Sequence, residues 1–420
     1  MPRRKYLIIC VLCLFAYNIQ AKTWVVCPTC PLQSIKESIA LAAQGDTVLV
    51  KSGLYQENLI EIHTPITLLG ENYPVIDSEY GEEIITVFSD STIIKGFQLQ
   101  NIGVSYLKER SGIRLVENQG CIIENNRLID TFFGIYLKNV RNSIIRNNEI
   151  IGNLKDKFDP GNAIHLWQCR EITIEDNLVT GHRDGIYFEF VNKSKIRRNQ
   201  SMDNQRYGLH FMFSNDDVYE ENVFHSNGAG VAVMFSQNII MHRNAFVKNW
   251  GGAAYGILLK EISHGEMTHN TFDENTKGIY AEGASDLLIQ HNDFTDNGWA
   301  MDIKGSCIDN QILENNFINN TFDVVTNSKR NPNLFMHNYW SKHPGYDLNR
   351  NGYADTPYQP VSLLSMIVEK IPAATLLLHS MLAYLFDYSE KVFPSLIPAA
   401  LVDEEPAMRP IQHDTFRESK

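Results

Sequence analysis

Six side chains that suit contact with a partner or a soft metal ion recur at matching places in a repetitive part of this chain. They are His165, Trp167, Tyr187, His210, Met212 and Met234. One residue separates His210 from Met212, and Met234 lies one repeat further along. Imidazole and thioether groups bind soft ions such as Cu(I), so this pattern predicts contact with copper in transit. The alternative is that these residues meet a partner protein or the C-terminal segment, and a carbohydrate groove is a third interpretation.

Two cysteines and two histidines form smaller candidate sites. Cys27 and Cys30 enclose Pro and Thr, a spacing that fits a copper-holding thiolate pair, a redox pair or a small structural disulfide in an oxidising compartment. His269 and His291 stand one repeat apart and would share a metal only if both rings turned to the same point. Their alternative role is that of solvated residues on a polar turn.

Oxygen-bearing side chains near the end of the repeats resemble a calcium-binding loop. The stretch DLNRNGYAD offers Asp347, Asn349, Asn351 and Asp355 as ligands around Gly352. It lacks the bidentate Glu of a complete EF-hand loop. The alternative is a turn in which Asp and Asn side chains bond to the backbone.

Small residues recur along the chain and define the fold. Most steps between them are 22 or 23 residues, with one of 29 and one of 26, and an asparagine series keeps the same phase. The two longer steps indicate loops inserted at Leu154–Asn162 and Trp250–Tyr255. The small-residue markers are Gly112, Gly134, Ala163, Gly185, Gly208, Gly230, Gly256, Gly278 and Ala300. The asparagines are Asn126, Asn148, Asn177, Asn199, Asn222, Asn244, Asn270, Asn292 and Asn316.

Each repeat alternates apolar and polar residues, as strands do. About 22 residues with short strands and no helix is typical of one coil of a right-handed parallel β-helix, and we expect about ten coils. The asparagines should form a hydrogen-bonded ladder inside one turn. Outward positions should form two columns. The first is His165, Tyr187, His210, Ala232, Leu258, Tyr280 and Asp302; the second is Trp167, Glu189, Met212, Met234, Lys260, Glu282 and Lys304.

The remaining segments frame this β-helix. Residues 1–21 have the basic start and short apolar run of a signal peptide, and residues 22–360 form the β-helix with a capping helix at Leu32–Ala43. Residues 361–420 comprise a helical segment, Ser362–Phe393, and an acidic tail that we expect to be flexible. The apolar run Ala373–Phe386 is short and contains His379, which favours docking on a membrane protein over spanning the bilayer.

Charge and cysteine content exclude some classes of function. The formal net charge of −12 argues against nucleic acid as a partner, because phosphate contacts need clustered Lys and Arg. Beyond the signal segment the cysteines are Cys27, Cys30, Cys121, Cys169 and Cys307, an odd number that does not suit a disulfide scaffold. An exported β-helix could also be a polysaccharide lyase or hydrolase. Asp216 and Asp217 are its nearest catalytic candidates, and no partner base is evident.

The chain resembles the NosD family over nearly all of its mature length. The most specific stretch is Arg206–Phe213 (RYGLHFMF), and further similarity lies in Gly161–Leu166, Arg183–Tyr187, Tyr255–Leu258, Asn338–Trp340 and Gly345–Pro360. Cys27 to Cys30 is a departure that is not associated with every member, so the role of this pair stays open.

The resemblance implies a function without catalysis by this chain. NosD proteins are periplasmic and are held at the inner membrane by the permease of an ABC-type transporter, whose ATPase is cytoplasmic. The family is implied to help build the copper–sulfide centre of nitrous oxide reductase, taking copper from a membrane-anchored chaperone and engaging the apo-reductase. On this reading copper is at most transient, calcium is optional, and the two outward columns face the partners.

Overall fold

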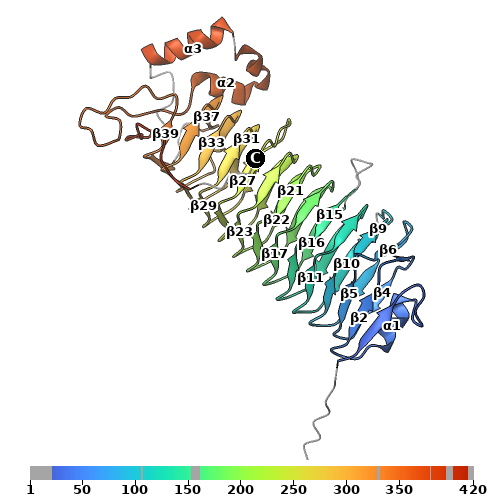
Figure 1. The fold of residues 1–420 in the computed structure, drawn as a ribbon. Coiled ribbons are helices and arrows are strands. Elements are labelled where there is room, and N and C mark those ends of the chain that lie inside the picture. Colours follow the sequence, from blue (N-terminus) through green and yellow to red (C-terminus); the bar gives the residue numbers. More distant parts are fainter. Residues whose placement is uncertain are drawn as a thin grey trace, which may run out of the picture.

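A computed structural model describes residues 21–105, 107–152, 161–328, 332–378, 380–393 and 401–414. All but the last residue of the predicted signal segment 1–21, most of the loop Leu154–Asn162 and His379 lie outside the described residues. The described strands stack into a long parallel solenoid with a small helix at one end and a helical segment at the other (Figure 1). The predicted fold class, a parallel β-helix, is therefore confirmed.

Three parallel sheets run the length of the solenoid, and each complete coil contributes one strand to each sheet. Sheet A contains β1 (Thr23–Val26), β2 (Thr47–Val50), β5 (Thr67–Gly70), β8 (Ile93–Lys95), β11 (Ile122–Glu124), β14 (Ile144–Arg146), β17 (Thr173–Glu175), β20 (Lys195–Arg197), β23 (Val218–Glu220), β26 (Ile240–His242), β29 (Glu266–Thr268), β32 (Leu288–Gln290), β35 (Gln311–Leu313) and β38 (Leu334–Met336). Sheet B contains β3 (Leu54–Tyr55), β6 (Val75–Asp77), β9 (Gln98–Gln100), β12 (Arg127–Ile129), β15 (Glu149–Ile151), β18 (Leu178–Thr180), β21 (Gln200–Met202), β24 (Val223–His225), β27 (Ala245–Val247), β30 (Thr271–Asp273), β33 (Asp293–Thr295), β36 (Asn316–Ile318) and β39 (Tyr339–Trp340). Sheet C contains β4 (Ile60–Ile62), β7 (Ile85–Val87), β10 (Ser111–Val116), β13 (Phe133–Lys138), β16 (Asn162–Trp167), β19 (Asp184–Glu189), β22 (Tyr207–Met212), β25 (Ala229–Met234), β28 (Ile257–Lys260), β31 (Lys277–Glu282), β34 (Trp299–Ile303) and β37 (Phe322–Val325).

The stack is longer than the ten or so coils predicted. Within the described residues sheet B alone has 13 strands. The additional coils lie mainly before Gly112, where β2 to β9 alternate inward and outward residues without the glycine and asparagine markers. The markers reported only the coils that carry the ladder, so the count based on them was too low.

The asparagine ladder exists and lies in the turn between sheets A and B. Each side-chain oxygen accepts the backbone N–H of the preceding ladder residue, as in Asn199 N to Asn222 Oδ1 at 3.0 Å. Asn292 donates to Asn315 and Asn315 to Asn338, so Asn315 holds the position predicted for Asn316. A second ladder, which the sequence analysis missed, occupies the turn between sheets B and C. Its members are Asn204, Asn227, Asn249, Asn275, Asn297 and Asn320.

Stacked aromatic rings fill the interior of the later coils. Phe246, Phe272 and Phe294 lie face to face with ring centroids 4.6 and 4.7 Å apart, and Phe317 and Trp340 continue the stack. All of these residues are fully or almost fully buried. Stacked rings on successive rungs bury a large apolar area, and this burial stabilises the solenoid.

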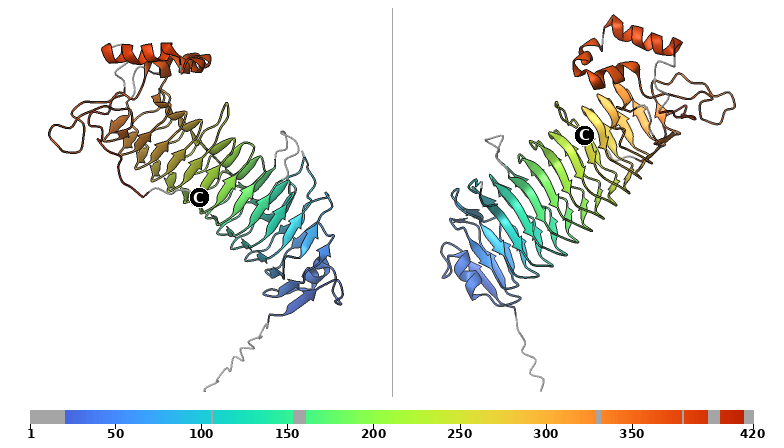
Figure 2. Two further views of the ribbon diagram at one scale, coloured as in Figure 1. Left: turned by 45° about the horizontal axis from the view of Figure 1, so that its top comes forward. Right: turned by 180° about the vertical axis from the view of Figure 1, so that it is seen from behind.

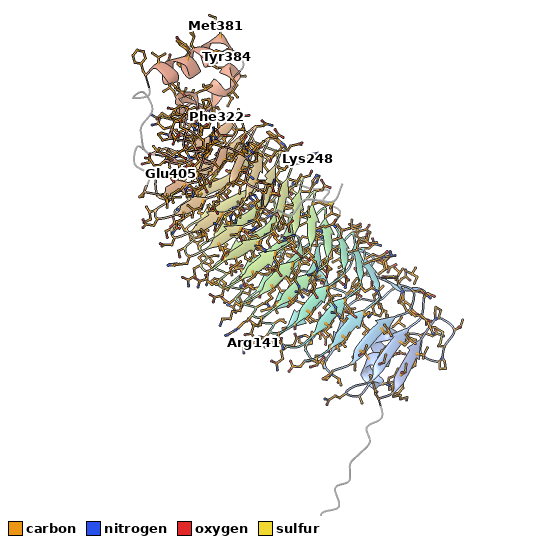
Figure 3. All side chains as sticks on the ribbon, turned by 60° about the vertical axis from the view of Figure 1, so that its left-hand side comes forward. Arg141, Lys248, Phe322, Met381, Tyr384 and Glu405 are labelled. Carbon is orange, nitrogen blue, oxygen red and sulfur yellow. A yellow bond between two sulfur atoms is a disulfide. The ribbon has the colours of Figure 1, made fainter. Side chains whose placement is uncertain are left out.

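Helices close both ends of the stack. Helix α1 (Ile35–Leu41) lies within the predicted cap, is capped by Ser34, and buries Ile35 against the first coil. At the other end α2 (Leu363–Lys370), the 3₁₀ helix η1 (Pro372–Leu377) and α3 (Met381–Val392) fall inside the predicted helical segment. Helix α2 packs on β37 through Leu364, Val368 and Phe322, and Figure 3 shows Phe322 where the helices meet the stack.

The tail predicted to be flexible packs along the β-helix over residues 401–414. This strap, Leu401–Asp414, starts beside β38, and runs back past several coils until Asp414 reaches Arg243 (Figure 2). Asp403 is fully buried there and accepts hydrogen bonds from Asn338 N, Asn338 Nδ2 and Trp340 Nε1 at 3.0 to 3.1 Å. Asp403 thus takes the place of the next asparagine and ends the first ladder. An acidic, proline-containing sequence does not reveal this role, because the partners of Asp403 are distant in the chain.

We expect Asp403→Ala to lower the free energy of unfolding by about 2–4 kcal/mol, because it removes four hydrogen bonds and leaves buried donors without partners. The strap should also become an early cleavage site in limited proteolysis. Glu405→Ala is the matched control, since Glu405 is an exposed strap residue whose carboxylate pairs with the His337 ring at 3.0 Å. An unchanged melting temperature for Asp403→Ala would show that the ladder does not depend on the strap.

Candidate functional site

The two predicted columns lie side by side on the outer face of sheet C. The strand register aligns His165 with Tyr187, Tyr187 with His210, and Met212 with Met234. The alternating partners Ile186, Phe188, Leu209 and Phe211 point into the core. Sequence periodicity therefore placed both columns on the correct face.

The first column is much less exposed than outward positions were expected to be. His210 is 4% exposed and Ala232 and Asp302 are fully buried. The rings of Tyr136, His165 and Tyr187 stack at centroid separations of 4.7 Å, and Tyr207 and Tyr187 enclose His210. His210 is buried although it points outward, because large side chains on one outward column cover one another. Burial, with Arg114 nearby, also lowers the pKa of His165 to about 3, so its ring is neutral.

A cavity of about 460 Å³ opens over these coils. It is lined by His165, Tyr187, His210, Met212 and Met234, together with Arg183, Asp184, Arg206 and residues of the loop before β10. Five of the six predicted partner-facing residues therefore share one cavity. Trp167 is not part of its lining and instead lies 5.4 Å from the ammonium group of Lys138.

His210 is the most unusual group in this cavity. Neither ring nitrogen has a hydrogen-bond partner among the described residues, and Nδ1 lies 3.6 Å from Asp184 Oδ2. Oδ1 of Asp184 is also buried without a partner. A buried polar group without a partner costs stability, so this pair is available to bind something that enters the cavity.

The thioethers of Met212 and Met234 lie beside His210 on adjacent rungs. Both are partly buried, and the Tyr187 hydroxyl lies 3.8 Å from the Met212 sulfur. One imidazole and two thioethers form a donor set for Cu(I), and the buried, unpaired nitrogens of His210 fit this role. Within the described residues no group of three or more His, Cys, Asp or Glu is arranged to hold a metal ion.

Cys27 and Cys30 form a disulfide next to the first strand. Cys121, Cys169 and Cys307 are free thiols inside the solenoid. Burial raises the pKa of Cys121 to about 11 and that of Cys169 to about 12, so neither is a thiolate at neutral pH. The structural reading of the Cys27–Cys30 pair is the one that this geometry supports.

The calcium-like loop is held by its own side chains. The Asp347 carboxylate accepts hydrogen bonds from the backbone N–H groups of Asn351 and Gly352, at 3.1 and 2.8 Å. The Asp355 carboxylate accepts hydrogen bonds from the backbone N–H of Leu348 and from the side-chain amide of Asn349. Gly352 has a φ of +94°, which suits glycine at this bend. These bonds match the turn interpretation, and calcium at this loop stays a prediction.

His269 and His291 belong to a row of rings on the edge between sheets A and B. Their centroids are 5.1 Å apart, His242 lies on the preceding coil, and His413 of the strap packs against both. His413 Nε2 lies 2.9 Å from Asp293 Oδ1, and His291 Nε2 lies 2.7 Å from Glu314 Oε2. Carboxylates thus occupy nitrogens that a shared metal would need, and the row fastens the strap.

Asp216 and Asp217 do not form a catalytic pair. Asp217 is fully buried in the turn, where its Oδ1 accepts the Ser194 N–H at 2.7 Å, whereas Asp216 is exposed. Asp217 Oδ2 has no partner among the described residues, and burial raises the pKa of this carboxyl well above its usual value. The residue serves the turn rather than a substrate.

We expect Asp217→Asn to stabilise the protein at pH 8 by about 1–2 kcal/mol, because a neutral amide retains the bond to Ser194 without a buried charge. The raised pKa means that the folded state of the natural protein holds this proton more tightly than the unfolded chain. Its stability therefore rises as pH falls from 8 towards 5, and the advantage of the variant shrinks. Urea unfolding at several pH values measures this. Asp216→Asn is the control, and a gain for Asp217→Asn that grows at low pH would contradict the prediction.

Among the described helices none is long and apolar enough to cross a membrane.

Comparisons with known proteins point to one family. The family model described as periplasmic copper-binding protein (NosD) matches residues 39–158 and 154–356. A protein of Pseudomonas aeruginosa named probable ABC transporter binding protein NosD is 26% identical over 430 residues, covering 89% of this chain and 91% of that protein. A protein of the same name from Stutzerimonas stutzeri is 25% identical, covering 85% and 86%.

A solved structure supports the fold alone. The family 28 exopolygalacturonase of Yersinia enterocolitica aligns with a TM-score of 0.59 at 10% identity, over 75% of this chain and 78% of the enzyme. Its likeness agrees with the parallel three-sheet topology, which confirms the right-handed β-helix class. Taken together with the match over most of the solenoid, these findings show that the chain belongs to the NosD family of periplasmic copper-binding proteins.

Proposed function

We propose that this chain is the periplasmic docking scaffold of an ABC-type transporter complex, and that it supports assembly of the copper–sulfide centre of nitrous oxide reductase. In this role it binds a copper chaperone and the apo-reductase and hydrolyses nothing itself. The observation that carries the proposal is the cavity on sheet C, where buried His210, whose ring nitrogens have no hydrogen-bond partner among the described residues, lines the same space as Met212 and Met234. Soft donors over an open cavity suit the passage of Cu(I) from one protein to another.

The helical segment supports attachment to the permease. Large apolar side chains project from it, among them Leu376, Met381, Tyr384, Tyr388 and Phe393, which are 61% to 87% exposed. Met381 and Tyr384 stand at the far end of the molecule, away from the coils (Figure 3). Such a cluster marks a contact surface in an otherwise polar protein. The permease is the proposed partner, since docking there leaves the solenoid projecting into the periplasm, where chaperone and reductase can reach sheet C.

Ion pairs connect the helical segment to sheet C. Lys304 contacts both buried Asp302 on sheet C and Glu369 on α2. Lys277 also pairs with Asp302, at 2.6 Å. These partly buried charges tie the helices to β31 and β34 of sheet C, the sheet whose outer face carries the cavity on earlier coils, so binding at the permease can bias what the scaffold holds.

The test is the copper content of nitrous oxide reductase isolated from cells that lack this chain. The proposal expects a reductase that lacks its copper–sulfide centre while its electron-entry copper site fills normally. A fully loaded, active reductase would refute it. The rival function, lyase or hydrolase, would then be examined by incubating the purified chain with acidic polysaccharides.

A further inference from the structure

Three phenylalanines form an exposed row at the turn between sheets C and A. Phe190, Phe213 and Phe235 are 39% to 43% exposed, and their rings stack with centroids 5.2 and 5.1 Å apart. We call this row the Phe ridge. Exposed stacked rings of this size are rare on a surface that meets only water, and they indicate a contact.

The backbone conformation at the ridge positions is unfavourable for phenylalanine. Each ridge residue has a positive φ, of 56°, 52° and 53°, a conformation that bulky L-residues avoid at a cost of about 1–2 kcal/mol each. On five other coils the equivalent position has the same conformation but carries a polar residue or glycine. These residues are Glu117, Asn139, Gln168, Glu261 and Gly283. Fold stability alone therefore does not explain phenylalanine on three successive coils.

The ridge adjoins the soft donors of the cavity. Phe213 directly follows Met212, and Phe235 directly follows Met234. The backbone N–H of Phe213 donates to the carbonyl of Met234 on the next coil, at 3.1 Å. A protein seated on the ridge would therefore place its own surface within one residue of both sulfur atoms.

The shape of the ridge selects among occupants. A sugar ring packs against the face of an aromatic ring, but here the faces cover one another and mainly ring edges are presented. Edges suit the aliphatic and thioether side chains of a protein surface. Because the neighbouring donors favour Cu(I), the fitting partner is a protein that carries Cu(I) at an exposed site with an apolar rim.

We propose that the Phe ridge is the docking surface for the copper-carrying protein, placing its Cu(I) against Met212 and Met234. This inference rests on the proposed function and assigns one partner to one surface. The apo-reductase would then bind elsewhere on the chain. Aromatic anchors of this kind commonly supply most of the affinity of an interface.

The test compares the full-length mature chain with a variant, Phe190→Asn with Phe213→Asn and Phe235→Asn. Asparagine tolerates positive φ, so the variant should fold with an equal or higher melting temperature. The probe is the purified soluble domain of the membrane-anchored copper chaperone, loaded with Cu(I), and its dissociation constant is measured by calorimetry. We expect affinity to fall by about 30-fold or more, since anchor residues of an interface often contribute this much. Binding of the apo-reductase should be unchanged.

Matched controls and the other outcomes separate the two proposals. Gln168→Asn and Glu261→Asn change the same backbone position on the flanking coils and should alter affinity by less than about twofold. Equal binding by the triple variant would overturn the ridge while leaving the proposed function intact. A natural chain that does not bind the chaperone at all would overturn both. Loss of self-association in sedimentation, or of binding to an acidic polysaccharide, without loss of chaperone binding would assign the ridge to a second copy or to a glycan.

Discussion

Replacing Asn222 with alanine should lower the free energy of unfolding by about 3–5 kcal/mol, because this residue lies in the interior of the first ladder. Asn222 Oδ1 accepts from the backbone and side-chain nitrogens of Asn199, both at 3.0 Å. Its Nδ2 donates to Ile196 O at 2.9 Å and to Asn244 Oδ1 at 3.0 Å. The substitution breaks four hydrogen bonds and leaves buried backbone groups without partners, while the ladder on both sides loses its continuity.

Urea and thermal unfolding of the purified chain measure this effect. Gln200→Ala, at an exposed position close to Asn199 in the same coil, is the control and should change stability by no more than about 0.5 kcal/mol. If Asn222→Ala and Gln200→Ala unfold together, the ladder adds no stability and aromatic stacking alone holds the coils. An Asn222→Ser variant, with a shorter hydroxyl, should not restore the loss because it spans fewer of the four bonds.

Replacing Met212 and Met234 together with leucine should reduce filling of the copper–sulfide centre by about tenfold or more. Leucine has nearly the volume of methionine, so the coils should stay intact, but it offers no sulfur to Cu(I). The two substitutions remove two of the three proposed donors while keeping side chains of similar size. The measurement is copper per reductase and its activity in cells that produce only the double variant.

A methionine outside the cavity provides the control for this experiment. Met202 lies on sheet B, where its neighbour in the register is His225, and Met202→Leu should leave reductase loading unchanged. The double variant should also retain chaperone binding through the Phe ridge, which separates docking from copper transfer. Normal loading by the double variant would show that copper does not pass along these sulfurs.

His210 illustrates how far periodicity reaches. Alternation and the repeat length placed it beside Tyr187 and next to Met212, and the register agrees. Its burial depends on the rings of Tyr207 and Tyr187, whose packing follows from side-chain size and rotamer rather than from spacing. The His210 side chain therefore points away from the core and is nevertheless shielded from solvent.

The Phe ridge was overlooked for a related reason. In sequence, Phe190, Phe213 and Phe235 stand one residue beyond each strand, where apolar residues usually mark an inward position. Only the turn conformation shows that all three project outward. A signal was available in the printed sequence, since the same repeat position carries a polar residue or glycine on the neighbouring coils.

Local, repeated features of this protein were determined by its sequence: the β-helix class, the alternation that fills the core, most of the first asparagine ladder, and the helices at both ends. Each of these features depends on residue spacing within one or two coils, so it is determined when similar coils stack on one another. The tertiary structure alone decided the number of coils, the return of the strap to Asp403 and His413, and the closure of the cavity around His210. These depend on contacts between residues far apart in the chain, where the balance of burial and hydrogen bonding is set by neighbours that no repeat pattern specifies.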